Sequence, residues 1–330
     1  MASATASNMA MELSILNANP KRIPGPTLLH QLVATHHSLK PLAIDYISAD
    51  GISEQVTYAE LHQRSDRLAK TIRHVWERTR DESSPDFIVP LFMAQCPDLY
   101  VAQIAVLKAG GAFCPISLDV PEERLRFILG DVNAKILLTT THLRQNLPKL
   151  DDVTLIATDE EHGDVERSVA ELAPDPAAPA YIMYTSGSTG QPKGVVLSHS
   201  AATQALLAHD CHIPQFARFL QFASPTFDVS VFEIFFPFFR AATLVCGDRR
   251  KLLSDLPGFV NRMDIDAAEL TPSVASSLLQ GRSSVPKLRT LLTIGEMLKH
   301  DVVEEFGGSV DEDSVLHGMY GPTEVSRFQS

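Results

Sequence analysis

Short apolar runs alternate with helix-patterned stretches along most of this chain, and this alternation constrains the fold more than any other feature. Buried strands are predicted at residues 87–92, 135–139 and 153–158, and the prolines Pro97 and Pro121 open helices between the first two. The same alternation continues beyond residue 180. Strands separated by helices cannot pair as hairpins, so they favour parallel pairing. The sequence therefore predicts an α/β protein built on parallel sheet.

Local signals place several helices within that pattern. Residues 57–60 read Thr-Tyr-Ala-Glu, a capping box that opens a helix reaching about residue 78. A phenylalanine-rich helix is predicted at 229–239, and it is too short and too closely flanked by strands to be a membrane anchor. The last predicted strand covers 314–319 and runs into the segment 320–324.

Composition excludes several classes of function. The chain has 330 residues, of which 45% are hydrophobic and 21% charged, and this is typical of a globular protein. Its net charge of -12 argues against nucleic acid and anionic membranes as partners. No apolar run reaches the ~18 residues of a membrane span, and no signal peptide is expected. Residues 1–20 are predicted to be a mobile tail. The four cysteines lack a Cys-x-x-Cys spacing, which predicts reduced thiols and a cytoplasmic protein.

A loop of small, hydroxyl-bearing and glycine residues interrupts two strand-like runs between residues 180 and 200. It reads Thr185-Ser186-Gly187-Ser188-Thr189-Gly190-Gln191-Pro192-Lys193-Gly194. Short side chains leave backbone N–H groups accessible to an anion, and Lys193 adds a point charge. The Walker A spacing fails because Gly194 follows Lys193, and neither a G-x-G-x-x-G nor a G-x-S-x-G motif occurs. The pattern favours a phosphate-binding loop over the alternative, a flexible surface loop.

Other candidates have simpler interpretations when taken alone. His209 and His212 could share a helix face, but a structural zinc site needs further ligands that no second cluster offers. His199 is interpreted as a helix N-terminal residue, and Asp228 as the N-cap of the phenylalanine-rich helix. By itself Tyr320 would be a core residue, and Glu324 a carboxylate in the first turn of a helix.

Taken together, five segments resemble the motifs of the adenylate-forming, AMP-binding enzyme superfamily, which includes the acyl-CoA synthetases. In chain order these segments are residues 56–61, 107–116, 184–194, 227–230 and 320–324. The second, fourth and fifth resemble the adenylation domains of nonribosomal peptide synthetases. This resemblance implies the large N-terminal domain of the adenylate-forming fold over residues 21–330, with stacked α/β subdomains and mostly parallel sheets.

The resemblance also implies a reaction, namely the ATP-dependent activation of an amino acid as an aminoacyl-adenylate, with Mg²⁺. Residues implied in catalysis are Lys193, Thr323, which would contact the α-phosphate, and Glu324, which would ligate Mg²⁺. Residues implied in nucleotide binding are Thr185, Ser186, Gly187, Ser188, Thr189, Gly190, Gly295, Glu296, Tyr320 and Gly321. The loop would hold the β- and γ-phosphates, and Tyr320 would lie against adenine.

The amino-acid pocket follows from the same resemblance. Asp228 would pair with the α-ammonium group, because a buried ammonium needs an anionic partner. The other implied pocket residues are Val229, Phe232, Glu269, Leu292, Ile294 and Met319, followed by Arg327 and Phe328. Glu269 suggests a substrate with a polar or cationic side chain, or else it forms a salt bridge with Arg327. The sequence leaves both open.

Several features depart from the family pattern. No Thr-Gly-Asp motif, no lysine-bearing C-terminal lid domain and no phosphopantetheine-bearing carrier domain occur in this chain, and Gly318 stands where an asparagine is usual. The large domain is therefore expected to be truncated, with an open sheet edge at its C-terminal end and little adenylate formation in isolation. A peptidyl carrier domain would be an external partner. Two alternatives remain: a non-catalytic nucleotide- or partner-binding remnant, and an acyl-CoA synthetase-like carboxylate ligase, which Asp228 disfavours.

Overall fold

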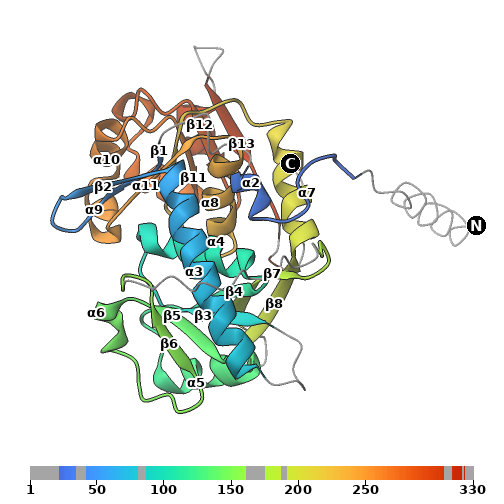
Figure 1. Cartoon of the computed structure of the whole chain (residues 1–330). Coiled ribbons are helices and arrows are strands. Elements are labelled where there is room, and N and C mark those ends of the chain that lie inside the picture. The colour runs from blue at the N-terminus through green and yellow to red at the C-terminus, as the bar shows by residue number, and fades with distance from the viewer. Residues whose placement is uncertain are drawn as a thin grey trace, which may run out of the picture.

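A computed structural model describes residues 22–34, 42–80, 87–160, 175–186, 192–307, 314–321 and 323, with only the backbone of Ser186. Two β-sheets lie in separate halves of the molecule, with helices between them (Figure 1). Both sheets are mostly parallel, as the sequence predicts. The predicted tail at residues 1–20 lies outside the described residues.

The larger sheet contains seven strands within the described residues. Their order across the sheet is β13 (Val315–Gly318), β12 (Thr290–Thr293), β11 (Ala267–Leu270), β9 (Arg218–Leu220), β10 (Thr243–Gly247), β1 (Leu42–Ile47) and β2 (Ser53–Thr57). All neighbours are parallel except β1 and β2, which form an antiparallel pair. The strand nearest the C-terminus, β13, therefore lies at an edge of the sheet as far as the structure describes it.

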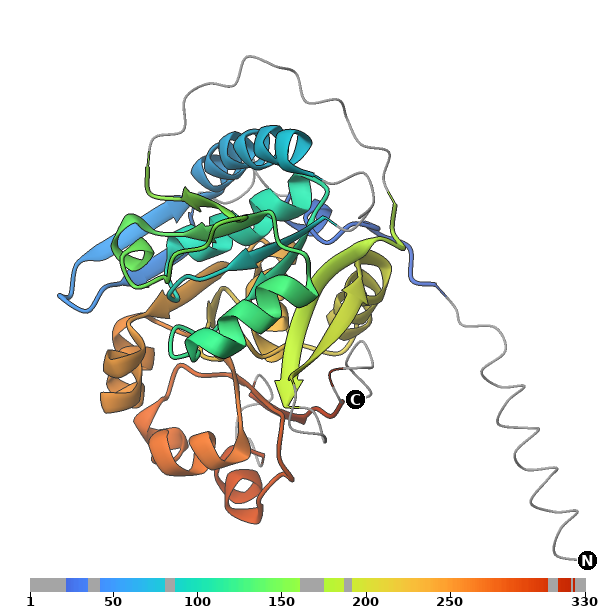
Figure 2. The same cartoon turned by 90° about the horizontal axis from the view of Figure 1, so that it is seen from below.

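In the smaller sheet the described strands number six. Their order is β6 (Thr154–Ala157), β5 (Ile136–Thr139), β3 (Ile88–Leu91), β4 (Ala112–Pro115), β7 (Pro179–Ser186) and β8 (Pro192–Ser198). Only β7 and β8 pair antiparallel. Figure 2 shows this long pair, in yellow-green, at one side of the molecule. The two strands of this pair carry the start and the end of the signature loop.

Helices form three layers around the two sheets. The middle layer contains α3 (Tyr58–Thr79), α4 (Pro97–Lys108) and α8 (Val229–Phe239), with α2 (Gln31–Ala34) and α7 (His199–Asp210) beside them. The outer face of the larger sheet carries α9 (Arg249–Ser254), α10 (Leu256–Arg262), α11 (Pro272–Leu278), α12 (His300–Phe306) and the short η1 (Arg282–Ser284). In Figure 2 these orange helices lie away from the blue α3. Helix α5 (Glu122–Asp131) covers the smaller sheet, and α6 (Thr141–Arg144) precedes β6.

Strand alternation assigns each side chain to one of these layers. Leu244 and Cys246 of β10 pack in the central core, whereas Val245 between them packs against the outer helices. In β5, Leu138 faces the centre and Leu137 faces α5. This follows from the period of two in a strand, which sends successive side chains to opposite faces. Both sheets are therefore apolar on both faces, as expected for parallel sheets covered by helices.

Two strands, the short helices α2, α6 and α9 and the 3₁₀ helix η1 were not predicted from the sequence. β2 begins with the exposed polar residues Ser53, Glu54 and Gln55, which carry no apolar alternation. β4 is only four residues long and follows directly on two glycines. The short helices α6 and α9 offer too few turns for periodicity to detect. The remaining predicted strands and helices are confirmed, with ends shifted by a few residues.

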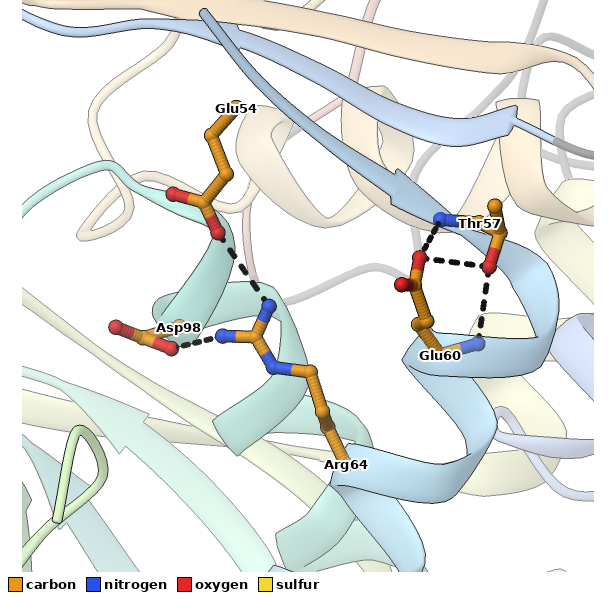
Figure 3. A network of polar contacts seen from close by, with 5 residues as sticks. All are labelled: Glu54, Thr57, Glu60, Arg64 and Asp98. Carbon is orange, nitrogen blue, oxygen red and sulfur yellow. Dashed lines mark hydrogen bonds and ion pairs between the residues drawn. The ribbon is translucent and has the colours of Figure 1, made fainter. Parts of the chain in front are cut away.

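The predicted capping box at the start of α3 is confirmed (Figure 3). The Thr57 hydroxyl accepts a hydrogen bond from the Glu60 amide at 3.2 Å, and the Glu60 carboxylate accepts one from the Thr57 amide at 2.8 Å. One turn later, Arg64 lies 3.4 Å from Glu54 of β2 and also pairs with Asp98 of α4. These contacts join the strand directly to the helix and hold α3 against α4.

Replacement of the cap residue tests this junction. We expect Thr57→Ala to lower the free energy of unfolding by ~1 kcal/mol, because the Glu60 amide in the first turn loses its side-chain acceptor. Urea unfolding monitored by circular dichroism measures the loss. Thr71→Ala in the interior of the same helix is the control and should change stability by less than ~0.5 kcal/mol. Equal losses in the two variants would contradict a specific role for the cap.

Candidate functional site

A pocket of about 520 Å³ opens where the two sheets come together. The smaller sheet contributes Pro115 at the end of β4 and residues 183–185 near the end of β7. The larger sheet contributes residues 226–228, between β9 and α8, and Thr323, beyond β13. Ligands of open α/β sheets bind outside the carboxyl ends of the strands. The pocket therefore lies where this fold places a binding site.

Three predicted site residues from distant parts of the sequence line this pocket together. They are Thr185 of the signature loop, Asp228 at the start of α8 and Thr323 of the last motif. The pocket also contains Asp119 and Arg124, which the sequence did not single out and which lie at the N-terminal end of α5. A charged residue near the start of a predicted helix gives no signal by itself, since such positions are usually solvated.

The strands of the signature loop are held in register by the β7–β8 pair. Thr185 lies opposite Lys193, and Tyr184 lies opposite Gly194. A Cβ at Gly194 would approach the Tyr184 ring to 3.2 Å, so glycine allows the ring to lie across the neighbouring strand. The Tyr184 hydroxyl donates to the Asp131 carboxylate of α5 at 2.5 Å. The side chain of Lys193 is exposed and is not among the pocket residues.

Asp228 is both the N-cap of α8 and a residue that lines the pocket, the two positions that the sequence predicts for it. Its side chain is 6% exposed and its Oδ1 accepts a hydrogen bond from the Val229 amide at 3.0 Å, so it caps α8. The residue also lines the pocket. An N-cap carboxylate stands where the partial positive charge of the helix end favours an anion. Capping and pocket lining are therefore compatible.

The predicted amino-acid pocket residues gather on one side of the larger sheet. Phe232, Leu292, Ile294 and Met319 belong to the central core cluster, and Val229 packs against it. Glu269 of β11 lies beside Leu292 of β12 in parallel register and is only 1% exposed. Parallel neighbours in register point to the same face, so Glu269 shares the face of Leu292. The structure thus brings these six predicted residues together.

The residues predicted around adenine lie at the ends of β12 and β13. Gly295 has a φ of +87°, a conformation that glycine adopts without strain. The Glu296 carboxylate accepts hydrogen bonds from the amide and the hydroxyl of Ser273, so it holds the start of α11. Tyr320 is 76% exposed, which makes the alternative of a core tyrosine wrong. Gly321, the next residue, is partly buried.

Several predicted residues lie outside the described part of the chain. They are Gly187, Ser188, Thr189, Gly190, Glu324, Arg327 and Phe328, together with the side chain of Ser186. Their roles stay predictions, and the salt bridge between Glu269 and Arg327 stays an open alternative.

The histidines are structural in this fold. His199 is the first residue of α7, as expected, and its Nδ1 accepts a hydrogen bond from the Leu29 amide at 3.0 Å. Burial lowers the pKa of His199 to about 4, so the ring is neutral near pH 7. Burial lowers the pKa of His209 to about 4 as well. Within the described ranges, no group of three or more His, Cys, Asp or Glu residues could hold a metal ion.

Glu233 in the middle of α8 is a polar group that sequence reasoning missed. It is fully buried, and its Oε2 accepts hydrogen bonds from the Phe222 amide, the Ala223 amide and the Gln221 side chain at 2.8–3.0 Å. Burial raises the pKa of Glu233 to about 8, although these donors oppose the shift. A glutamate inside the run Val-Phe-Glu-Ile-Phe was the available signal, because an unpaired charge is not tolerated in such a helix.

The raised pKa of Glu233 predicts a pH dependence of stability. Between the ordinary pKa of 4.5 and the folded value of about 8, the folded protein binds more protons than the unfolded chain. This contribution to stability is complete at low pH and is lost as pH rises through about 8. Because glutamine does not titrate, Glu233→Gln should gain stability relative to wild type between about pH 5 and pH 8.

Urea unfolding of both proteins across this pH range measures the difference. Glu123→Gln, at an exposed position of α5, is the control and should follow the wild-type profile. If the profile of Glu233→Gln runs parallel to that of wild type, the assignment of a shifted carboxyl at Glu233 is wrong.

Comparison with known proteins decides the family. The profile of the family described as "AMP-binding enzyme" matches residues 33–328. The chain belongs to this family. The finding confirms the resemblance seen in the five sequence motifs.

Several relatives to which this chain is similar are peptide synthetases. Nonribosomal peptide synthetase 2 of Gibberella zeae is 51% identical over 320 residues, which are 95% of this chain and 6% of that protein. Nonribosomal peptide synthetase SIDC of Beauveria bassiana is 51% identical over 323 residues, with the same coverage. The hydroxamate-type ferrichrome siderophore peptide synthetase of Schizosaccharomyces pombe is 31% identical over 315 residues, covering 90% of this chain and 6% of its own. The chain thus spans about 6% of the length of these relatives.

Solved structures of AMP-binding enzymes have the same fold. The nonribosomal peptide synthetase FmoA3 in its AMPPNP-bound form superposes with a TM-score of 0.76 at 26% identity, over 94% of this chain and 33% of that one. The fatty acid AMP ligase of Legionella pneumophila superposes with a TM-score of 0.77 at 17% identity, over 92% of this chain and 56% of that one, a likeness of fold alone. The predicted large domain of the adenylate-forming fold is confirmed. Among the described helices, none is long and apolar enough to cross a membrane.

Proposed function

We propose that this chain binds ATP and an amino acid and activates the amino acid as an aminoacyl-adenylate for nonribosomal peptide synthesis. The observation that carries this proposal is the shared pocket lined by Thr185, Asp228 and Thr323. It offers hydroxyl donors for phosphate oxygens next to an anion for an ammonium group. Membership of the AMP-binding family supports the nucleotide, and the peptide synthetase relatives support the amino acid.

The proposed reaction joins the two substrates at the α-phosphorus. A carboxylate oxygen of the amino acid forms a bond to this phosphorus, and the bond to the β-phosphate oxygen breaks with release of pyrophosphate. Such a transfer depends on positioning and charge stabilisation more than on covalent catalysis. In the proposal, Asp228 holds the ammonium group while the hydroxyls of Thr185 and Thr323 donate to the phosphate oxygens. The loop at 185–190 grips the β- and γ-phosphates, with Lys193 as a nearby charge.

The rest of the nucleotide lies, in this proposal, along the ends of β12 and β13. Gly295, Glu296 and Gly321 line the adenine side, and the exposed ring of Tyr320 stacks on the base. The exposure of Tyr320 is consistent with such stacking, because a core tyrosine could not reach a ligand.

The donor set of the pocket suits Mg²⁺ bound together with nucleotide. Magnesium in nucleotide sites takes most of its oxygen ligands from phosphates, water and one or two carboxylates. The described residues fit this pattern, because the pocket offers the Thr185 and Thr323 hydroxyls and no cage of three acidic or histidine ligands. Glu324, adjacent to Thr323, would supply the carboxylate. When bound, the ion would neutralise phosphate charge.

Glu269 suggests the substrate class. It is 1% exposed and lies beside Leu292 in the register of β11 and β12, and a carboxylate among the proposed pocket residues favours an amino acid with a polar or cationic side chain. The name of the ferrichrome synthetase relative adds hydroxamate-bearing amino acids as candidates. We further propose a domain spanning residues 21–330 that passes its product to a phosphopantetheine-bearing peptidyl carrier domain. A cytoplasmic location fits the four cysteines, which are all free thiols.

Asp228→Asn tests the proposed function. Calorimetry of the 330-residue chain should detect binding of ATP with Mg²⁺. It should also detect binding of at least one amino acid from a panel that contains the proteinogenic amino acids and glutamate γ-hydroxamate. Loss of a charge-assisted hydrogen bond should weaken amino-acid binding by about tenfold or more and leave ATP binding unchanged. Asp50→Asn, at an exposed position that is not among the pocket residues, is the control and should change neither affinity. Wild-type protein that binds neither ATP nor any amino acid would overturn the proposal.

Glu269→Gln tests the substrate class. If Glu269 meets a cationic or polar side chain, its neutral variant should change the order of preference within the same panel, by about tenfold for the preferred substrate. Leu291→Met, on the opposite face of β12 among the outer helices, preserves volume and should keep the order. An unchanged order in Glu269→Gln would exclude a contact between Glu269 and the substrate side chain.

A further inference from the structure

The position of Asp228 depends on the short segment that connects β9 to α8. β9 ends at Leu220, and residues 221–228 lead without further regular structure to the first turn of the helix. Three of these residues, Thr226, Phe227 and Asp228, line the pocket. The contacts that hold residues 221–228 in place therefore also determine the position of the Asp228 carboxylate in the pocket.

Glu233 of α8 forms hydrogen bonds with residues 221–223, at the beginning of the segment that leads into this helix. Its Oε2 accepts from the amides of Phe222 at 3.0 Å and Ala223 at 2.8 Å, and from Gln221 Nε2 at 3.0 Å. Glu233 and Asp228 are five residues apart, at the first turns of one helix. Because a helix is rigid over so short a distance, the bonds of Glu233 close a loop that begins and ends on α8.

The same network reaches the other half of the molecule. Gln221 Oε1 accepts from Gln95 Nε2 at 2.8 Å and from the Tyr100 hydroxyl at 2.9 Å. Gln95 also donates to the Ala223 carbonyl at 2.8 Å. Gln95 follows β3, and Tyr100 lies in α4, so both belong to the part of the chain that forms the smaller sheet. The segment before Asp228 is thus tied to both sides of the pocket.

Two further contacts hold the remaining backbone of the segment. The Ser230 hydroxyl lies within hydrogen-bond distance of the Phe227 and Pro225 carbonyls, at 2.6 and 3.2 Å. The Arg249 guanidinium donates to the Phe222 carbonyl at 2.7 Å and lies over the Phe222 ring. Neither contact replaces the bonds to Glu233, because both use carbonyl acceptors and leave the amides of 222 and 223 to the carboxyl group.

We propose that Glu233 is the positioning residue for Asp228, holding residues 221–228 so that the Asp228 carboxylate meets the substrate ammonium across the junction of the two sheets. This inference rests on the proposed function. Buried networks of this kind are rigid only when every donor has its acceptor. Removal of the acceptor at Glu233 would leave the amides of Phe222 and Ala223 without a partner, while Gln221 Nε2 would keep only the Ala223 carbonyl at 2.7 Å. We expect this to release the segment rather than the whole fold.

Paired variants of Glu233 separate positioning from stability. Glu233→Gln keeps an oxygen for the three donors, whereas Glu233→Leu keeps the volume but removes the acceptor. Ile72→Ala, a fully buried position in α3, is the control for general destabilisation. In metal sites, loss of a residue that orients a ligand commonly lowers affinity or activity by about 10–100-fold. We expect a comparable effect for a residue that orients the Asp228 carboxylate. We therefore expect Glu233→Leu to weaken binding of the panel amino acid by about tenfold or more while the affinity for ATP with Mg²⁺ is kept.

Hydrogen exchange of the free 330-residue chain gives a second measure that needs no substrate. Peptides covering 221–228 should exchange on the order of tenfold faster in Glu233→Leu, with no such change in Ile72→Ala. Glu233→Gln should restore both amino-acid binding and slow exchange. Gln95→Leu, at a partly buried position, should give a smaller change of the same sign and serves if Glu233→Leu does not fold.

The outcomes distinguish this inference from the proposed function. Unchanged exchange at 221–228 in both Glu233→Leu and Gln95→Leu overturns the positioning role, and so does equal weakening of amino acid and ATP. Failure of the wild-type chain to bind any amino acid overturns the proposed function instead. In that case faster exchange in Glu233→Leu, confined to 221–228, would still support Glu233 as the group that holds Asp228 in place.

Discussion

The burial of α4 and α8 on every side is the constraint from which the rest of this structure follows. Both helices lie between the two sheets, and nearly all their residues are excluded from solvent. A helix in such a layer cannot have a polar face, so its sequence is apolar all round. Each sheet therefore packs one face against the same central core. The opposite face of each sheet is apolar as well and is covered by an outer layer of helices. Five layers result from one shared core.

Three of the polar side chains buried in this layer contact the segment that leads to the site. Glu233, Ser230 and Tyr100 lie on the central helices and are fully buried. Each one forms a hydrogen bond with a residue between β9 and Asp228. A polar group without a partner in this layer would cost about 1–3 kcal/mol of stability. These three side chains avoid that cost through their hydrogen bonds with the segment. The polar network therefore coincides with the segment that reaches the pocket.

Sequence reasoning located the long elements well and missed short ones, including β2 at an edge of the larger sheet and β4 inside the smaller one. The long helix α3 was predicted with its cap because Thr57 and Glu60 are a local signal, and α8 because its apolar run has helical length. β2 and the antiparallel pairing of β7 with β8 escaped, since both lie at edges where one face or one neighbour is missing. Family resemblance named Thr185, Asp228 and Thr323, but periodicity could not have joined them, because no local pattern links residues so far apart.

Local chemistry written in the sequence predicted most of the regular elements and the resemblance to the AMP-binding family, which the comparison confirmed. The phosphate-binding character of the loop stays a prediction. Short-range interactions control these features: capping, strand alternation and the small side chains of residues 185–194. Only tertiary structure decided that Thr185 and Thr323 line the same pocket as Asp228, that Tyr320 is exposed and that Glu233 accepts three hydrogen bonds. Those outcomes depend on how two sheets pack against one helical layer, and the free energy of that packing is shared among residues from the whole chain.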